Sequence, residues 1–360
     1  MKLKTTIAGI SLENPLMPAS GPLVGSYEKM MAIGEFGVGC MVSKTISVEG
    51  AVVPRPCILS EGKSIMNAEL WSEYPMTYWV EQILPRLKRD LKTPLILSVG
   101  YTREDMEFLI PALDIYADAF EVSTHYVGKD LQSIGETVRT ITGLTQKPVF
   151  MKISPHIPDP VAFAQVVREN GAKGIVAINS LGPCMKIDAA SRRITAGNEQ
   201  GELWTSGPVI KSLALAIVHR IKKALPDFTV IGVGGIESAE DVVEFLLAGA
   251  DGVQMLSAAM LRGKDLYARI IKDLPGKLSE LGFDSVEEVK RTGLANLPLR
   301  YEPRHPVIDV DKCTLCGLCE KVCPYFALQC KEQVEVSEED CFGCGLCQTK
   351  CPSKAISGVL

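Results

Sequence analysis

The sequence of 360 residues lacks the features that would place it in a membrane or on nucleic acid. No apolar run reaches the ~20 residues that a membrane-spanning helix needs. The N-terminal stretch "MKLKTTIAGISLENP" has no long apolar core of the signal-peptide kind. Basic and acidic residues number 38 and 43, a net charge of −5, so no basic surface for nucleic acid or anionic lipid is expected. We therefore expect a cytoplasmic protein with no nucleic-acid partner and no membrane partner.

The sequence also lacks the G-x-G-x-x-G fingerprint of dinucleotide-binding folds. The nearest stretch, "GVGGIES" at 232–238, has closely spaced glycines in a different pattern. It also follows the seventh expected strand rather than the first. The chain is therefore expected to have no nicotinamide-binding domain, and chemistry with NAD(P) would require a separate partner.

What the chain does contain is eight short apolar segments rich in Val, Ile and Leu, typical of strands buried on both faces. Helix-length segments lie between them, including 75–91, 159–172 and 238–250. Pro85 predicts a kink or break in the first of these, and Ser238 followed by Asp241 predicts the start of the third, which ends at Gly249. The expected strands are 15–19, 40–44, 95–99, 119–123, 149–153, 175–179, 230–234 and 252–256.

Strands that alternate with helices in this number predict a (β/α)8 TIM barrel, with a doubly wound open sheet as the alternative. Polar or glycine residues follow most of the expected strands. In a barrel all of these strand ends meet at one rim, where barrel active sites lie. In an open sheet they would divide around a single crevice. The residues concerned are Ser20, Lys44, Ser123, Lys152, Asn179, Gly234 and Ser257.

The cysteines divide the chain into two parts. Eight of the twelve form two runs after residue 312 that both read C-x2-C-x2-C-x3-C-P, and Cys330 lies between the runs. We expect a barrel with a helical connector over 1–300, a proline-containing linker over 301–308, and a small domain over 309–360. The small domain resembles the bacterial two-cluster ferredoxins over nearly its whole length.

The spacing of the cysteines predicts two [4Fe–4S] clusters. Three thiolates on one loop hold one cluster, and the fourth cysteine of each run reaches the other cluster. Zinc is the alternative, but zinc sites pair two C-x2-C knuckles for one metal, and four cysteines in each run are too many. The predicted ligand sets are Cys313, Cys316, Cys319 and Cys351 for one cluster, and Cys323, Cys341, Cys344 and Cys347 for the other.

An electron relay of this kind needs a redox centre to serve. The loops after the seventh and eighth strands of a barrel commonly hold a phosphate through backbone N–H groups. Gly234 and Gly235 allow a close backbone approach there, and residues 256–260 supply the second loop. Flavin mononucleotide (FMN) has one phosphate and converts two-electron chemistry into one-electron steps, so we expect it as the barrel's cofactor.

Several longer stretches resemble the dihydroorotate dehydrogenase family: "NPLMPASG" (14–21), "SKTIS" (43–47), "MKISP" (151–155), "INSLGP" (178–183), "TSGPVIKSLAL" (205–215) and "VGGIESAEDVVEFLLAGADGVQMLSA" (233–258). With the ferredoxin tail, the chain resembles the flavin and iron–sulfur part of dihydropyrimidine dehydrogenase, or its separate bacterial subunit. The resemblance implies substrate contacts from Asn67, Ser123, Asn179 and Ser180. The cofactor-binding residues are expected to be Ala19, Ser20, Gly21, Lys44, Thr45, Lys152, Asn179, Ser180, Gly207, Gly234, Gly235, Ser257 and Ala258.

The fourth strand ends unlike the family pattern N-x-S-C-P. Ser123 replaces the substrate-binding asparagine, and Tyr126 stands where the proton-transferring cysteine would be. Tyr126 is one candidate for the catalytic residue; with a pKa of about 10 it is better placed to give a proton than to take one. His125, whose ordinary pKa is about 6.5, is the other candidate. In a third interpretation neither does chemistry, and Cys184 or His156 could reach the same rim.

The leading hypothesis is an iron–sulfur flavoprotein that acts on a carbonyl-conjugated C=C bond of a cyclic substrate, as dihydropyrimidine dehydrogenase does. It would exchange electrons through its two clusters with a ferredoxin or an NAD(P)-linked flavin subunit. One alternative is a dihydroorotate dehydrogenase of pyrimidine synthesis. Another is an electron-transfer subunit without catalysis. The resemblance further implies a homodimer or a hetero-oligomer.

Overall fold

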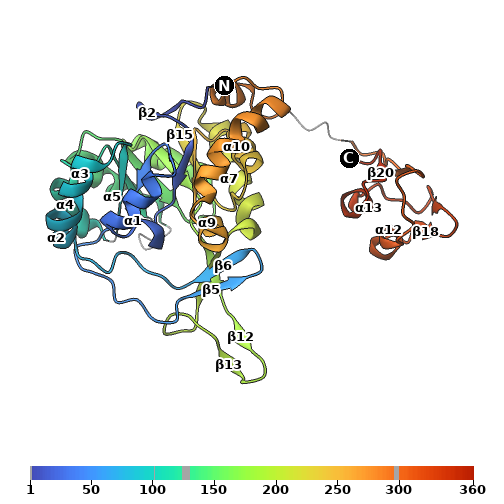
Figure 1. Ribbon diagram of the computed structural model, residues 1–360, viewed down its shortest axis with the longest axis horizontal. Helices are drawn as coiled ribbons and strands as arrows, with labels where there is room; N and C mark the ends of the chain where they lie inside the picture. Colours follow the sequence, from blue (N-terminus) through green and yellow to red (C-terminus); the bar gives the residue numbers. More distant parts are fainter. Residues whose placement is uncertain (1, 101, 124–129, 296–299) are drawn as a thin grey trace. The chain divides into compact units, whose positions relative to one another are not determined.

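The computed structural model describes residues 2–100, 102–123, 130–295 and 300–360. The chain divides into two compact units, Met1–Leu294 and Ala295–Leu360. Figure 1 traces both units in the order of the sequence. Within the described residues, no helix is long and apolar enough to cross a membrane.

The first unit is built on eight parallel strands in the order β3-β16-β15-β10-β9-β8-β7-β4. They form a nearly closed barrel, as predicted, and the open-sheet alternative is wrong. Three strands have the predicted bounds, whereas β4 is shorter, because the N–H of Lys44 leaves the ladder to donate to the carbonyl of Val24 at 3.0 Å. The strands are β3 (Leu16–Pro18), β4 (Met41–Val42), β7 (Leu95–Val99), β8 (Ala119–Ser123), β9 (Val149–Ile153), β10 (Gly174–Ala177), β15 (Thr229–Val233) and β16 (Gly252–Met255).

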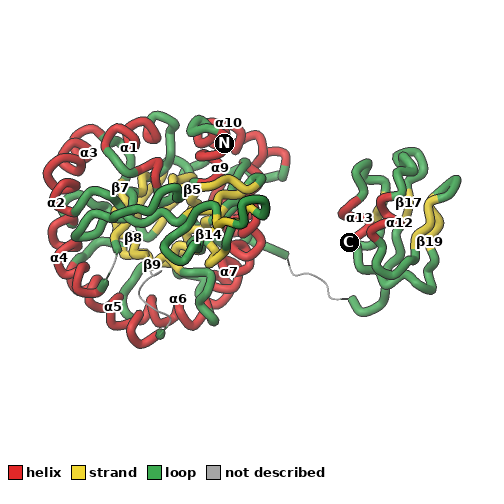
Figure 2. The backbone as a smooth tube through the Cα atoms, turned by 90° about the horizontal axis from the view of Figure 1, so that it is seen from below, coloured by secondary structure: helices red, strands yellow, loops and turns green. Residues whose placement is uncertain are grey.

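Helices surround the barrel, as Figure 2 shows with helices in red around strands in yellow. Ser238 caps α8 by accepting from the N–H of Asp241, and Gly249 follows with φ +108°, as predicted. The helices of the first unit are α1 (Tyr27–Gly34), α2 (Met76–Tyr78), α3 (Leu84–Asp90), α4 (Arg103–Leu113), α5 (Leu131–Leu144), α6 (Pro160–Glu169), α7 (Lys211–Ala224), α8 (Ala239–Leu247), α9 (Ser257–Arg262), α10 (Leu266–Glu280) and α11 (Val286–Thr292).

The predicted break at Pro85 is wrong in its position. A π-helical turn, η2 (Trp79–Ile83), joins α2 to α3, and Pro85 sits at the start of α3. Proline is tolerated in the first turn of a helix, where its missing N–H has no partner to lose. The N–H of Leu84 donates to the carbonyl of Trp79, five residues back, so the irregular turn precedes the proline.

A short hairpin, β1 (Thr5–Ile7) and β2 (Ile10–Leu12), closes one end of the barrel. Ile7 and Leu12 are buried and pack with the inward-facing residues of the barrel strands, including Met17, Ile96 and Phe150. In Figure 1 this hairpin lies at the end of the barrel opposite to β5 and β6. The barrel interior is therefore a packed core, which leaves the other rim for a binding site.

That other rim carries a second, antiparallel sheet that the sequence analysis did not predict. Its order is β11-β14-β6-β5, and we call it the rim sheet. Its strands are short, and several of their residues are exposed or half-buried, so they carry no continuous apolar pattern. The strands are β5 (Ile58–Glu61), β6 (Ser64–Asn67), β11 (Leu181–Cys184) and β14 (Leu203–Ser206), and a hairpin of β12 (Ile187–Asp188) and β13 (Arg193–Ile194) lies between the last two.

The second unit is small and has two similar halves. Each half contains a short helix whose N-cap is a glycine with positive φ, Gly317 for α12 and Gly345 for α13. Its small core contains Leu328, Cys347 and Ile356. The elements are β17 (Val307–Ile308), α12 (Leu318–Val322), β18 (Leu328–Cys330), β19 (Val334–Val336), α13 (Leu346–Lys350) and β20 (Ile356–Ser357).

Candidate active site and cluster sites

A cavity of about 680 Å³ opens at the barrel rim, within the ~300–1,000 Å³ usual for ligand and cofactor sites. Its floor is made by residues at the carboxyl ends of the strands, and residues of the rim sheet line it as well. Every described residue predicted to bind cofactor or substrate lines this one cavity. They are Ala19, Ser20, Gly21, Lys44, Thr45, Asn67, Ser123, Lys152, Asn179, Ser180, Gly207, Gly234, Gly235, Ser257 and Ala258.

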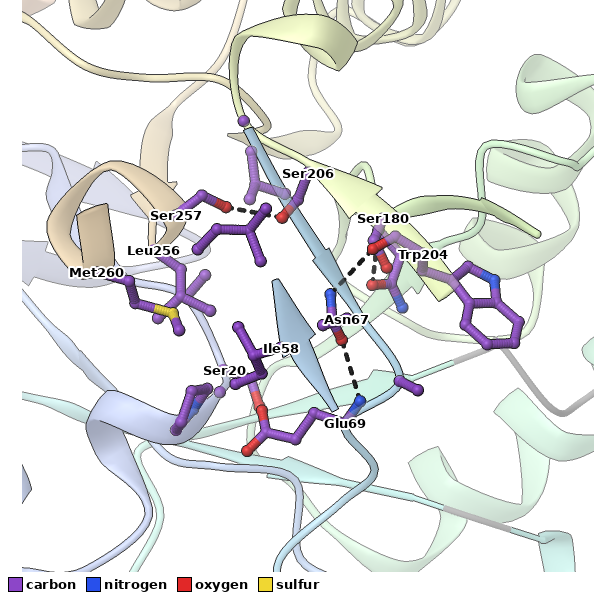
Figure 3. Close-up of a pocket in the computed structure, with 18 of the residues that line it drawn as sticks. Ser20, Ile58, Asn67, Glu69, Ser180, Trp204, Ser206, Leu256, Ser257 and Met260 are labelled. Atoms are coloured by element: carbon purple, nitrogen blue, oxygen red, sulfur yellow. Dashed lines mark hydrogen bonds between the residues drawn. The ribbon is translucent and has the colours of Figure 1, made fainter. Parts of the chain in front are cut away.

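One end of the cavity is a cradle of glycines and hydroxyl groups. A Cβ atom on Gly235 would lie 2.9 Å from the carbonyl oxygen of Gly207 and 2.7 Å from the Cβ of Lys211. The loop after β15 can therefore lie against Gly207 only with glycine at this position. The hydroxyls of Ser206 and Ser257 are 2.7 Å apart across the cradle (Figure 3). Backbone N–H groups and paired hydroxyls of this kind suit a phosphate, so the cradle fits the phosphate of FMN.

A chain of side-chain hydrogen bonds runs along the cavity floor from one strand to the next. The hydroxyl of Thr45 lies 3.1 Å from that of Ser20 and 3.0 Å from that of Ser98. Ser98 in turn donates to Oε1 of Glu121 at 3.4 Å. These hydrogen bonds hold the hydroxyl groups of Ser20 and Thr45 in the cavity lining, where they can face a flat ring, and connect them to the buried Ser98 of β7.

Lys152 lies at the centre of the floor, on β9. Its Nζ is 3.2 Å from Oε1 of Glu121 and 3.3 Å from Oε1 of Gln254. Gln254 also donates from Nε2 to the other oxygen of Glu121 at 2.7 Å. Glu121 and Gln254 are fully buried and Lys152 is nearly so. A buried carboxylate with these two partners stays satisfied and holds the lysine in one position.

Lys44 lies beside the floor, after β4, and is 3 % exposed. Its Nζ is 2.9 Å from Oε1 of Glu69 and 2.9 Å from Oε2 of Glu73. Burial raises the pKa of Glu69, although Lys44 opposes this shift. For Glu73, burial is the largest single effect and acts in the same direction, but the hydrogen bonds from Lys44 and from a backbone N–H, together with the charges of Lys44 and Lys29, outweigh it and the pKa is lowered. One ammonium group thus serves two carboxylates.

The predicted substrate residues lie on the side of the cavity covered by the rim sheet. Asn67 donates to the carbonyl of Trp204 at 3.2 Å and accepts from the N–H of Glu69 at 3.3 Å, so its amide is held in place (Figure 3). Oδ1 of Asn179 accepts from the N–H of Ser180 at 2.9 Å, and among the described residues its NH2 group has no hydrogen-bond partner, so it can donate to a ligand. These groups can bind carbonyl and N–H groups of a flat ring.

The two predicted catalytic residues, His125 and Tyr126, lie outside the described residues. The two alternatives to them do not line the cavity among the described residues. Sγ of Cys184 donates to the carbonyl of Leu203 at 3.1 Å and packs into a small cluster with Met66 and Leu203. Burial raises the pKa of its thiol, which makes it a poor thiolate.

The acidic side of the site was not predicted from the sequence. Glu69 and Trp71 line the cavity, and Glu73 forms an ion pair with Lys44 beside it. Glu69 and Glu73 belong to the same stretch as Asn67, "SIMNAELWSEYP", but no local pattern shows that they meet a lysine 25 and 29 residues earlier. Only the fold brings them together.

The second unit holds two small cavities, each lined by four cysteines. Cys313, Cys316, Cys319 and Cys351 line one, and Cys323, Cys341, Cys344 and Cys347 line the other. In both cavities the fourth cysteine of a run therefore joins the three of the other run. These are the two sets that the spacing predicts as cluster ligands.

The fourth cysteine of each run accepts an N–H group from the residue four positions later. The N–H of Ala327 donates to Sγ of Cys323 at 3.4 Å, and that of Ala355 to Sγ of Cys351 at 3.3 Å. Burial acts to raise the pKa of Cys351, but the hydrogen bonds from Ser353 and from backbone N–H groups lower it. Such bonds favour thiolate ligands and tune cluster potentials.

Comparison with known proteins agrees with both units. The family model for dihydroorotate dehydrogenase matches residues 2–278, more than half of the chain. The chain belongs to the dihydroorotate dehydrogenase family. The model for the 4Fe-4S binding domain matches residues 306–329 and 334–357. As a family member with two such segments, the chain is an FMN-dependent oxidoreductase acting on CH–CH bonds, and its cofactors are FMN and two [4Fe–4S] clusters, as predicted.

Relatives within the dihydroorotate dehydrogenase family include three catalytic subunits of dihydroorotate dehydrogenase B (NAD(+)). The one from Pyrococcus horikoshii is 33% identical over 302 residues, covering 80% of this chain and 96% of the relative. That from Thermococcus kodakarensis is 33% identical over 309 residues, covering 82% and 98%. That from Listeria monocytogenes is 29% identical over 305 residues, covering 81% and 98%. In each case about a fifth of this chain lies outside the match.

Proposed function

We propose that this protein transfers hydride between FMN and a carbon–carbon bond conjugated to a carbonyl in a pyrimidine-type ring. The observation that carries the proposal is the convergence, on one rim cavity, of a phosphate-type cradle, two lysines and a set of amide and hydroxyl groups. FMN, when bound, accepts or gives two electrons with the substrate and exchanges them one at a time with the clusters.

The chain's own residues would then have distinct tasks. Gly207, Gly235 and Ser257 hold the phosphate end of the cofactor. Lys44 and Lys152, each already paired with a carboxylate of the protein, would donate N–H groups to the ring system, where reduction develops negative charge. Asn67 and Asn179 orient the substrate ring, and the rim sheet keeps water from the reacting atoms.

The first candidate substrate is dihydroorotate, or orotate in the reverse direction. The relatives are catalytic subunits of dihydroorotate dehydrogenase B, and their names specify NAD(+). The chain would then deliver its electrons to an NAD-linked partner subunit or to a ferredoxin, in a homodimer or a hetero-oligomer.

The second candidate is an uncharged dihydropyrimidine, in the manner of dihydropyrimidine dehydrogenase. The observation that favours it is the carboxylate of Glu69 in the cavity wall, which a second carboxylate on the substrate would face. Ser123, at the position of the family's substrate-binding asparagine, is a further departure from the dihydroorotate pattern.

The test is an anaerobic half-reaction with the full-length protein and its clusters intact. The flavin is reduced with limiting dithionite, and orotate, uracil, thymine and fumarate are added separately while the flavin band is followed. Rapid re-oxidation by at least one pyrimidine and not by fumarate is expected. Re-oxidation by an external ferredoxin but by none of the rings would overturn the proposal and support an electron-transfer subunit.

The same assay tests the proposed proton carrier. Tyr126→Phe removes the phenolic proton while keeping the ring, and a loss of about 10²–10⁴-fold in the re-oxidation rate is expected if Tyr126 is the acid. His125→Ala is the comparison. If the histidine variant loses the rate and the tyrosine variant keeps it, the roles are reversed.

A further inference from the structure

The positive charge of the cavity is already neutralised by the protein's own side chains. Among the described residues that line it, the cationic side chains are Lys44 and Lys152, whereas Glu69, Glu199 and Glu237 are acidic. A substrate carboxylate buried in such a site needs a cationic or multiple N–H partner to offset its loss of hydration. The question is therefore whether either lysine can serve it.

Lys152 already has two buried hydrogen-bond partners in the barrel floor. Its Nζ contacts Glu121 at 3.2 Å and Gln254 at 3.3 Å, and both partners are fully buried. Turning the ammonium group toward a substrate carboxylate would leave Glu121 without its cation. Breaking a buried pair in this way is strongly unfavourable.

Lys44 already forms two ion pairs. It bonds Glu69 and Glu73 at 2.9 Å each, and its side chain is 4 % exposed against 14 % for Glu69. With both carboxylates ionised, the three groups carry one net negative charge. With Glu69 protonated, they carry none. In neither state does this corner of the cavity present positive charge to a ligand.

The remaining polar groups of the site suit an uncharged ring. The NH2 group of Asn179 can donate to a ring carbonyl, and the carboxylate of Glu69 can accept from a ring N–H. Figure 3 shows the Glu69 side chain extending from the end of β6 toward Ser20, below the rim sheet, and Glu69 lines the same cavity as Asn67 and Asn179.

We propose that Glu69 and Glu73 determine the specificity of this site: by holding Lys44 between them, they leave no cation for a ring carboxylate, so the site selects an uncharged cyclic amide. This inference rests on the proposed function and chooses between its two candidates. It assigns the two glutamates a role in binding selectivity that is separate from hydride transfer.

The test is ligand binding to the FMN-loaded protein, followed by the change in flavin absorbance. Orotate and orotamide are nearly equal in shape and differ in charge, and uracil is the smallest ring of the set. We expect the native protein to bind orotamide and uracil more than about tenfold tighter than orotate, since like charges facing each other cost several kcal/mol. The double variant Glu69→Gln, Glu73→Gln should reduce the ratio of orotamide affinity to orotate affinity by about tenfold, because Lys44 then has no carboxylate partner and can bind the carboxylate of orotate.

Glu237→Gln is the matched control, because it removes another carboxylate from the lining of the same cavity, on the loop after β15. It should leave the ratio unchanged. Should the double variant fail to hold FMN, Glu69→Gln alone, which keeps Glu73 as a partner for Lys44, must narrow the ratio several-fold. An orotate affinity equal to or above that of orotamide, or an unchanged ratio in the glutamine variants, would overturn the inference.

Failure of the inference is distinct from failure of the proposed function. If the rings exchange electrons with the flavin and orotate is preferred, the function stands and the charge selection is wrong. If none of the three rings binds or exchanges electrons, the function and the selection fall together.

Discussion

The contribution of the buried ion pair between Lys152 and Glu121 to folding stability can be measured independently of enzymatic activity. Lys152→Met removes the only cation bonded to Glu121 in the described structure and leaves that carboxylate fully buried with Gln254. We expect the variant to lose about 3–5 kcal/mol of unfolding free energy, because an uncompensated buried charge is left behind. Chemical denaturation followed by circular dichroism measures the loss.

The matched double variant separates charge from packing. Adding Glu121→Gln to Lys152→Met removes the stranded charge, and most of the lost stability should return. If the double variant is as unstable as the single one, then packing by the lysine side chain, rather than its charge, explains the loss.

Glu69 gives the stability of the barrel unit a predictable dependence on pH. Its pKa is raised in the folded protein, chiefly by burial, against the opposing charge of Lys44. Its contribution to stability is therefore complete below the ordinary carboxyl pKa of about 4.3 and is lost as pH rises through the raised value. Glu73 has a lowered pKa, so its contribution to stability changes with pH only at or below the ordinary carboxyl pKa and stays constant at higher pH.

Thermal unfolding of the native protein and Glu69→Gln across pH 5 to about 8 measures this dependence. The melting temperature of the variant should rise relative to that of the native protein as pH rises, because the variant lacks the carboxylate whose ionisation destabilises the fold. Lys44, Glu73 and, at longer range, Lys29 are the charged groups that act on Glu69. A difference in melting temperature that stays constant with pH would contradict the assignment.

At the scale of elements, Gly39 controls how the barrel closes. Its N–H donates to the carbonyl of Leu16 at 2.9 Å, linking the start of β4 to β3 at the open end of the strand order. A Cβ atom at this position would overlap the carbonyl oxygen of Asn14. We expect Gly39→Ala to lower the unfolding free energy by about 3 kcal/mol, the upper end for overpacking, because backbone must move.

Gly34→Ala is the control for this change. Gly34 ends α1, and a Cβ there would meet its neighbours at 3.7 and 3.9 Å, which is ordinary contact. That variant should stay within about 0.5 kcal/mol of the native protein or gain slightly, as alanine favours helix. Equal losses in the two variants, measured by denaturant unfolding, would refute the closure argument.

The barrel could be predicted from the sequence because its strands are buried on both faces. Segments such as 95–99 and 149–153 are mostly apolar and buried along their whole length, and each is followed by a polar residue or glycine that marks the rim. The rim sheet could not be predicted, since strands such as β5 and β11 are partly exposed and follow no alternation. The acidic partners of Lys44 were missed for the same reason, because their position depends on how β6 leads into the following loop.

At the scale of the whole molecule, the second unit depends on its clusters for stability. Its core of described residues is small, and eight cysteines line its two cavities. Units of this size usually need metals or disulfides in addition to a core. Removing iron with a chelator under oxidising conditions should therefore unfold residues 295–360 while the barrel unit keeps its flavin.

Limited proteolysis and flavin absorbance measure the two effects separately. The C-terminal unit should become sensitive to protease, whereas the flavin band and its re-oxidation by substrate should persist. Electron transfer to a one-electron protein acceptor should be lost. Loss of flavin together with iron would show instead that the barrel unit depends on the clusters.

The separation of the rim sheet from the barrel has a consequence for divergence. Most of the cofactor cradle lies on the loops after the barrel strands β15 and β16, whereas the strands that cover the substrate belong to the rim sheet, from which the cradle takes Ser206 at the end of β14. The rim sheet comes from two excursions of the chain, residues 58–67 and 181–206, which leave the barrel ladder and return to it. A lineage that keeps Ser206 can redraw the rest of these two surface segments and acquire a new substrate without altering the scaffold that holds the flavin. Exchanging both segments together between relatives, with the first extended through Glu73, is accordingly the natural unit for transplanting specificity within this family.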